Sequence, residues 1–251
     1  QGFALAITHR MDGIARGTSC ALLLNDRPVD ERVARSDVAA HFSFNKGSSP
    51  DAYPSSQMGA IALLRQALLD AQWNARTKVH DHDVTLAALA QQLSGRLVVE
   101  GADRNELLRW SVLLREFGVT PIAKGGGDEY ARLKAIKSTA MPLLLPLRLP
   151  EAYDVEDPYD AQEVTFARLK HWELAPYNAH RVDTAGIAFA FTTHGRTDLK
   201  GLWKDLRRMV ACGLDTARAL EAMTTDAARL FGLGDRRGTL APGMSADLIV
   251  T

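Results

Sequence analysis

The chain has 251 residues, enough for one (β/α)8-type barrel or two small domains, and its 46% hydrophobic and 24% charged content is ordinary for a globular protein. Lys and Arg number 30, as do Asp and Glu, so no net charge draws the chain to nucleic acid or to a membrane surface. The two cysteines, Cys20 and Cys212, exclude a disulfide scaffold and a cysteine-rich zinc site. No apolar run is long enough to span a bilayer, and the cellular compartment stays open.

Short apolar runs alternate with helical patterns along the chain, which predicts βαβ units and a parallel sheet. The runs that predict strands are residues 3–8, 20–24, 38–42, 96–99, 120–123, 143–147 and 187–192. The segments with helical periodicity are residues 56–74, 84–93, 105–117, 129–137, 160–174, 199–212 and 215–231. We expect Asp83 and Asp128 to cap helix N-termini, and Gly118 and Gly213 to follow helix C-termini.

Two loops stand out between these elements. Residues 44–56 are polar and rich in proline and serine, and such a loop between a strand and a helix would lie over a barrel mouth. Three glycines, Gly125 to Gly127, precede a predicted helix. Their N–H groups could face a phosphate, but three glycines alone are weak evidence for this, and a tight turn between strand and helix explains them.

The last part of the chain carries the most specific pattern. Residues 224–250 predict the end of a helix, a turn and a strand from Ala246, and they include Ala227-Ala228, Gly232-Leu233 and the run Gly238-Thr-Leu-Ala-Pro-Gly243. Asp247-Leu-Ile-Val250 completes a motif that resembles the C-terminal signature of the metal-dependent amidohydrolase superfamily, of the imidazolonepropionase-like kind. The resemblance implies a degenerate or partial copy with a TIM-type (β/α)8 barrel.

That resemblance also implies how the chain is divided. Residues 1–245 would form the amidohydrolase-like barrel, and residues 246–251 would begin a flanking β-sandwich. Residues 2–7 resemble the second barrel strand, so the first strand would lie upstream of Gln1 and the barrel would be incomplete. We expect the chain to be a segment of a longer protein, with the remainder of the polypeptide or a second subunit closing the barrel.

In the family, histidines and an acidic residue at the strand ends hold the metals and the catalytic base. Here Glu100 or Gly101 stands at the histidine position of strand five, and Lys124 or Gly125 at that of strand six. His194 stands where strand eight carries the family's aspartate, and strand four, at residues 38–42, has no Lys or Glu at its end. Glycine offers no ligand and lysine is a poor one, so the resemblance implies a barrel without its metal site.

We therefore expect a catalytically silent barrel with a structural role, and no cofactor. The alternative is a hydrolase of amide or cyclic amide C–N bonds that acts on a small molecule and uses zinc or another divalent metal. Its ligands would be His9, Glu100 and His194, with His194 catalytic, or would come from the missing upstream strand.

The charged residues at the predicted strand ends, which barrel topology would bring together at the mouth, have simpler interpretations as well. Lys124 and Arg148 could bind a small anionic substrate, or Lys124 could form an ion pair with Glu100 in a water-filled mouth. The sequence His80-Asp81-His82 matches a metal-ligand spacing, but it follows a polar segment and precedes a helix. We interpret it as a solvated loop.

Overall fold

The computed structural model describes residues 3–77, 83–196 and 199–247. The chain divides into two compact units. The first contains Gln1–Gly101, Arg109–Ile122 and Ser245–Thr251, and the second contains Ala102–Leu108 and Ala123–Met244. The pair His80 and His82, together with most of the predicted strand at 246–251, lies outside the described residues.

The first unit begins with a small antiparallel sheet. Its strands are β1 (Leu5–Thr8), β3 (Cys20–Leu23) and β4 (Val33–Arg35), in the order β1-β3-β4, and the short helix α1 (Val29–Arg32) precedes β4. Leu5 lies opposite Leu23 and Thr8 opposite Cys20. The prediction that residues 2–7 form a parallel barrel strand is therefore wrong. Eleven residues separate β1 from β3 with no helix between them, and the two strands pair antiparallel.

A second group of strands in this unit is mostly buried. β2 (Ala15–Thr18) pairs antiparallel with β5 (Ala40–Ser43), and β5 pairs parallel with β6 (Leu97–Glu100). Every residue of β5 and the first three of β6 are buried, as expected for strands covered on both faces. The helical segment that links β5 to β6 confirms the predicted βαβ unit.

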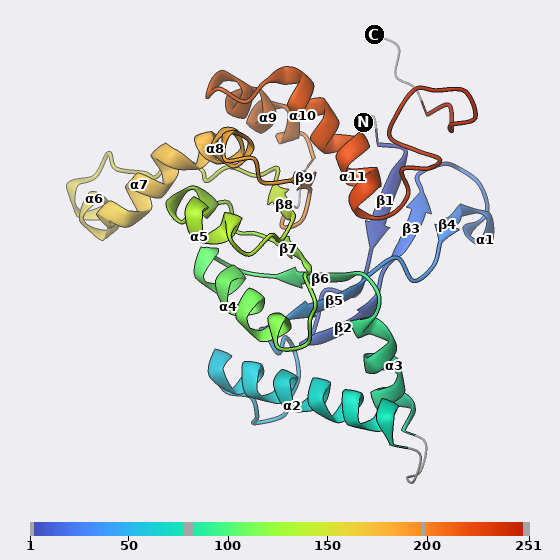
Figure 1. Cartoon of the computed structure of the whole chain (residues 1–251). Coiled ribbons are helices and arrows are strands. Elements are labelled where there is room, and N and C mark those ends of the chain that lie inside the picture. Colours follow the sequence, from blue (N-terminus) through green and yellow to red (C-terminus); the bar gives the residue numbers. More distant parts are fainter. Residues whose placement is uncertain (1–2, 78–82, 197–198, 248–251) are drawn as a thin grey trace. The chain divides into compact units, whose positions relative to one another are not determined.

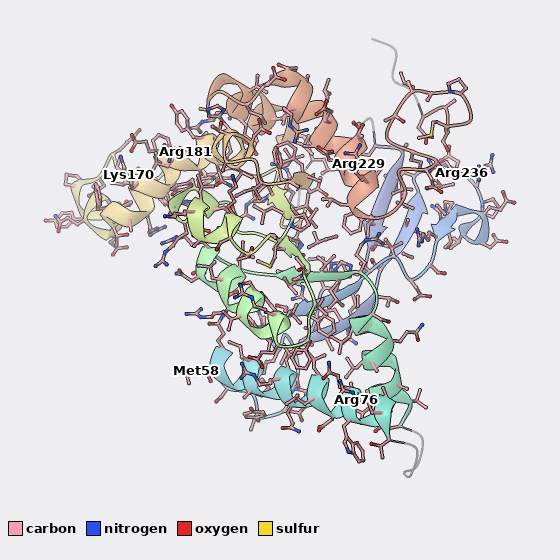
Figure 2. The ribbon with its side chains drawn as sticks, viewed as in Figure 1. Met58, Arg76, Lys170, Arg181, Arg229 and Arg236 are labelled. Carbon is pink, nitrogen blue, oxygen red and sulfur yellow. The ribbon has the colours of Figure 1, made fainter. Side chains whose placement is uncertain are left out.

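Three helices complete the first unit: α2 (Gln57–Arg76), α3 (Val84–Leu93) and α4 (Arg104–Arg115), whose first residues belong to the second unit. Figure 1 shows α2 and α3 next to each other, and Met58 and Arg76 mark the two ends of α2 in Figure 2. Asp83 caps α3 as predicted, since its Oδ1 accepts hydrogen bonds from the N–H groups of Thr85 and Leu86.

The core of the first unit is closed by an aromatic pair. The ring of Trp110 on α4 stacks on Phe44, with 3.8 Å between centroids. Trp110 is fully buried, and its Nε1 donates a hydrogen bond of 2.9 Å to the Glu100 carbonyl at the end of β6. The Trp110 side chain thus links α4 to β6, the strand that precedes it.

The second unit has three parallel strands, β7 (Ile122–Lys124), β8 (Leu143–Pro146) and β9 (Phe189–Thr192), in that order. Ala123 lies opposite Leu143, and Leu144 lies opposite Ala190. Its helical elements are η1 (Glu129–Ala131), α5 (Leu133–Lys137), α6 (Pro158–Glu163), α7 (Phe166–Leu174), η2 (Ala175–Tyr177), α8 (Asn178–Thr184), α9 (Leu202–Ala211), α10 (Thr216–Met223) and α11 (Thr225–Leu230).

Three segments predicted as single helices are interrupted in the second unit. The segment 129–137 breaks at Arg132, whose φ of −139° is not helical. The segment 160–174 breaks before Thr165, which starts a new helix by accepting a hydrogen bond from the Arg168 N–H. The segment 215–231 breaks at Thr224, after which the Thr225 hydroxyl donates to the carbonyl of Gly238. Threonine side chains thus form hydrogen bonds at the second and third breaks.

Candidate functional site

The carboxyl ends of β7, β8 and β9 share one edge of their sheet, because the strands are parallel and in register. Three predicted site residues lie at this edge. Lys124 is the last residue of β7 and is buried, Arg148 follows β8 by two residues and is exposed, and His194 follows β9 by two residues and is half-buried.

Arg148 and His194 belong to loops that contact each other. The Nη1 atom of Arg148 donates a hydrogen bond of 2.7 Å to the carbonyl of Gly195, next to His194. The backbone N–H of His194 donates a hydrogen bond to the hydroxyl of Thr192, two residues earlier, at the end of β9. The structure therefore brings these two loops together at the mouth of the sheet.

A buried carboxylate organises the loop after β7. Glu129 is fully buried, its Oε2 accepts a 2.6 Å hydrogen bond from Asn178 Nδ2, and its Oε1 accepts one of 3.2 Å from the Gly127 N–H. Burial raises the pKa of Glu129 above its ordinary value, although both hydrogen bonds oppose that change. Asn178 also accepts from the Tyr130 N–H, so one amide side chain connects α8 to η1.

This arrangement explains the three glycines. A Cβ on Gly125 would lie 1.9 Å from Glu129 Oε1, and one on Gly126 would lie 2.2 Å from the carbonyl of Ala102. Gly127 has a φ of +92°, which side chains rarely adopt. All three glycines therefore have a structural cause, which favours the turn interpretation.

Asp128 does not cap the following helix, contrary to the prediction. Its carboxylate instead accepts hydrogen bonds from the backbone N–H and the guanidinium of Arg104. The competing guanidinium comes from a residue 24 positions earlier, so the local pattern could not reveal it.

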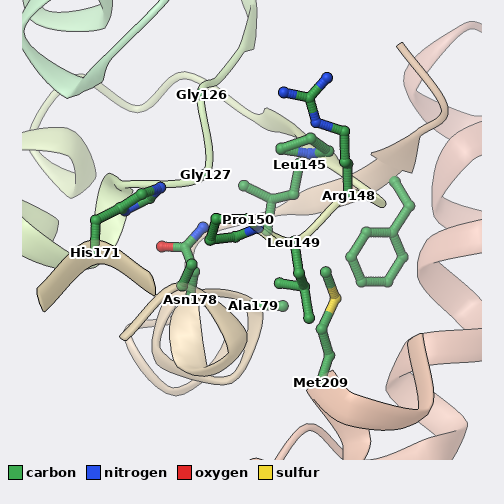
Figure 3. A pocket seen from close by; sticks show the side chains of 13 residues that line it. Gly126, Gly127, Leu145, Arg148, Leu149, Pro150, His171, Asn178, Ala179 and Met209 are labelled. Atoms are coloured by element: carbon green, nitrogen blue, oxygen red, sulfur yellow. The ribbon is translucent and has the colours of Figure 1, made fainter. Parts of the chain in front are cut away.

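A small cavity lies on one side of this glycine loop, and Figure 3 shows His171, Asn178, Arg148 and Met209 around it. Its volume of about 20 Å³ is room for roughly one water molecule. A much larger hollow of about 620 Å³ also borders the loop, at Gly126, and is lined by residues of η1, α7, α8 and the start of α4. Of the predicted site residues in this unit, Arg148 lines the cavity; Lys124 and His194 are not among the described residues that line either space.

The remaining two candidates belong to the first unit. The ring of His9, just after β1, stacks on His41 of β5 with 3.7 Å between centroids. Glu100, at the end of β6, accepts a 2.9 Å hydrogen bond from Arg16 Nη1, and the Arg16 side chain is only 5% exposed. The ion pair of Glu100 with Lys124 and the metal set of His9, Glu100 and His194 stay predictions. Among residues 3–77, 83–196 and 199–247, no three His, Cys, Asp or Glu side chains form a group that could hold a metal ion.

The sequence did not point to Glu129, Tyr130, His171, Asn178 or Arg181, which carry much of the polar chemistry of the second unit. Glu129 resembled an ordinary helix-start glutamate, and α8 was not predicted at all. The Pro176-Tyr177-Asn178 run that leads into α8 was the only available signal, since proline favours the first turn of a helix.

Comparison with known proteins gives a partial assignment. Residues 178–251 match the amidohydrolase family model. This part of the chain is therefore similar in sequence to amidohydrolases. It includes α8, β9 and the C-terminal motif that suggested the resemblance, and it contains His194. No curated protein is significantly similar to the chain in sequence.

The fold extends the amidohydrolase likeness over the chain. An amidohydrolase from Thermotoga maritima MSB8 superimposes with a TM-score of 0.79 and 14% identity, over 98% of this chain and 65% of that one. The fold is therefore of the amidohydrolase kind, and the chain spans less than two thirds of that relative's length. An uncharacterized metal-dependent hydrolase from Pyrococcus furiosus is similar over 64% of this chain and 34% of its own, at 16% identity and a TM-score of 0.46. None of the helices that the structure describes is long and apolar enough to cross a membrane.

Proposed function

We propose that this chain is part of an amidohydrolase-type (β/α)8 barrel that has lost its metal site and serves a structural or interaction role within a longer protein. The observation that carries the proposal is the contact between Gly125 and Glu129. Where the family resemblance places a metal-ligating histidine, the chain has Lys124 or Gly125, and the space beside Gly125 is filled by Glu129. A histidine at position 125 would place its Cβ only 1.9 Å from Glu129 Oε1.

The other strand ends support the proposal. Glu100 at the end of β6 is engaged by the buried guanidinium of Arg16, which competes for the carboxylate that a cation would need. Gly101, the adjacent residue, offers no side chain. The donor set at these positions thus does not suit the zinc-type site that the family resemblance implies, because too few imidazoles and free carboxylates are offered.

One observation supports the alternative function, a metal-dependent hydrolase. His194 is half-buried at the end of β9, in the segment that matches the amidohydrolase family. A hydrolase of amide or cyclic amide bonds could use His194 with His9 and Glu100, or with ligands from chain upstream of Gln1.

The test is metal content and activity of the full-length protein. Elemental analysis after brief dialysis without chelator is expected to find well below one zinc, manganese or iron per chain, and added zinc is expected to produce no hydrolysis of cyclic amides above the rate in buffer. Stoichiometric metal that disappears in the His194→Ala variant, but not in the matched variant His180→Ala, would contradict the proposal. His180 is a suitable control because it lies on α8 and lines neither space beside the glycine loop, within the described residues.

A further inference from the structure

The hollow beside the glycine loop has a distinct chemical character. Its charged lining residues are Arg104, Asp128, Lys170 and Arg181, and its apolar lining includes Phe166 and Leu174. Figure 2 shows Lys170 and Arg181 on the neighbouring helices α7 and α8. The volume of about 620 Å³ is in the range that holds a small organic molecule.

Most of these charges are already neutralised. The guanidinium of Arg104 pairs with Asp128, and the ammonium of Lys170 lies 2.8 Å from Glu173, one turn along α7. Arg181 differs, because no carboxylate pairs with it in the part of the chain that the structure describes. One cation without a partner suits a ligand with a single negative charge better than a doubly charged phosphate.

The guanidinium of Arg181 is nevertheless held in place. Its Cζ lies 5.7 Å from the ring centre of Tyr130 and 5.9 Å from that of Tyr177, so two aromatic faces restrict it. Its planar set of N–H donors matches the two oxygens of a carboxylate.

A polar pair lies beside this cation. The hydroxyl of Tyr130 is 3.1 Å from His171 Nδ1, and their rings are nearly parallel. Burial raises the pKa of Tyr130, which keeps the phenol protonated. The hollow therefore offers a fixed cation, a neutral hydroxyl and an apolar wall formed by Phe166, which is 77% exposed, and Leu174.

We infer that this hollow binds a small organic monocarboxylate, with its carboxylate on Arg181 and its apolar group against Phe166 and Leu174. The inference does not depend on whether the barrel is catalytic, because none of the residues involved occupies a family ligand position.

Benzoate is a suitable probe, with uncharged benzamide and inorganic phosphate as comparisons. Calorimetry or saturation-transfer NMR on the full-length protein is expected to show benzoate binding with a dissociation constant on the order of 1 mM, typical for so small a ligand. Binding is expected to weaken as salt is added, since the ion pair is partly exposed. Benzamide is expected to bind at least about 10-fold more weakly.

The variant Arg181→Gln is expected to weaken benzoate binding by about 10-fold or more, and Arg181→Lys by less, because lysine keeps the charge but not the paired donors. The matched control is Arg207→Gln, an exposed arginine on α9 that does not line the hollow among the described residues. Equal binding of benzoate and benzamide, unchanged affinity in folded Arg181→Gln, or no salt dependence in the unmodified protein would overturn the inference. Tighter binding of phosphate than of benzoate would overturn the assignment to carboxylates.

Discussion

Replacing Gly125 with alanine is expected to lower the free energy of unfolding by about 3 kcal/mol, an effect typical of overpacking at a buried polar contact. The added Cβ would lie 1.9 Å from Glu129 Oε1 and 3.5 Å from the side chain of Leu107. Glu129 and Leu107 are both fully buried, so moving either side chain away from the new Cβ would disturb the packing around it and destabilise the fold. Moving Glu129 would also lengthen its hydrogen bonds to Asn178 and to the Gly127 N–H.

Urea unfolding followed by circular dichroism measures this effect. Gly234→Ala is the matched control, because its Cβ would lie 3.5 Å from the nearest atom and its backbone is not in the left-handed region. That control is expected to change the unfolding free energy by less than about 0.5 kcal/mol. If Gly125→Ala were as stable as the control, the close packing of Glu129 against the loop would be wrong, and so would the main support for a lost ligand position.

Replacing Asn178 with aspartate is expected to destabilise the protein by about 3 kcal/mol near pH 8. The substitution preserves shape, and the aspartate can still accept from the Tyr130 N–H. It removes the donor that now lies 2.6 Å from Glu129 Oε2 and sets two carboxylates against each other in a buried site. One of them must hold a proton for the fold to survive.

The cost of Asn178→Asp is expected to depend on pH. Burial already raises the pKa of Glu129 from its ordinary value of 4.5, and a second carboxylate would raise the apparent pKa of the pair further. A group with a raised pKa in the folded state binds more protons folded than unfolded, so its stabilising effect is complete below the unfolded value and is lost as pH rises through the folded value. The difference in stability between the variant and the unmodified protein should therefore be small near pH 4.5 and grow toward pH 8.

Unfolding curves at several pH values give this difference directly, because the contributions of all other groups cancel. Asn45→Asp is the matched control: Asn45 is exposed and its Oδ1 accepts from the Gly47 N–H, which aspartate can also do. Its effect is expected to stay within about 0.5 kcal/mol at every pH. A cost for Asn178→Asp that does not change with pH would show that Glu129 is not in contact with residue 178.

Together these variants test the part of the proposed function that concerns the loop after β7. Glu129 occupies the room that a side chain at position 125 would need, and it is held there by Asn178 from α8. A single substitution of Gly125 by histidine would not fit here, because Glu129 would have to move or change as well.

The sequence by itself determined the elements whose signals are local. The alternation of apolar runs and helical stripes predicted β5 to β9, and Asp83 predicted the start of α3, because these features depend on neighbouring residues alone. The C-terminal motif likewise indicated the likeness of residues 178–251 to the amidohydrolase family, from residues that are close in the chain.

Only the tertiary structure decided the contacts between distant segments. Pairing of β1 with β3 separated residues 5–8 from the parallel strands, and Arg104 drew Asp128 away from its helix cap. Glu129 forms a hydrogen bond with Asn178, which lies 49 positions later in the chain. The glycines at 125–127, which the sequence presented as a weak phosphate-binding pattern, are explained by the space and backbone conformation of this loop. Burial and long-range pairing change what a carboxylate or a glycine does, and no local pattern encodes either of them.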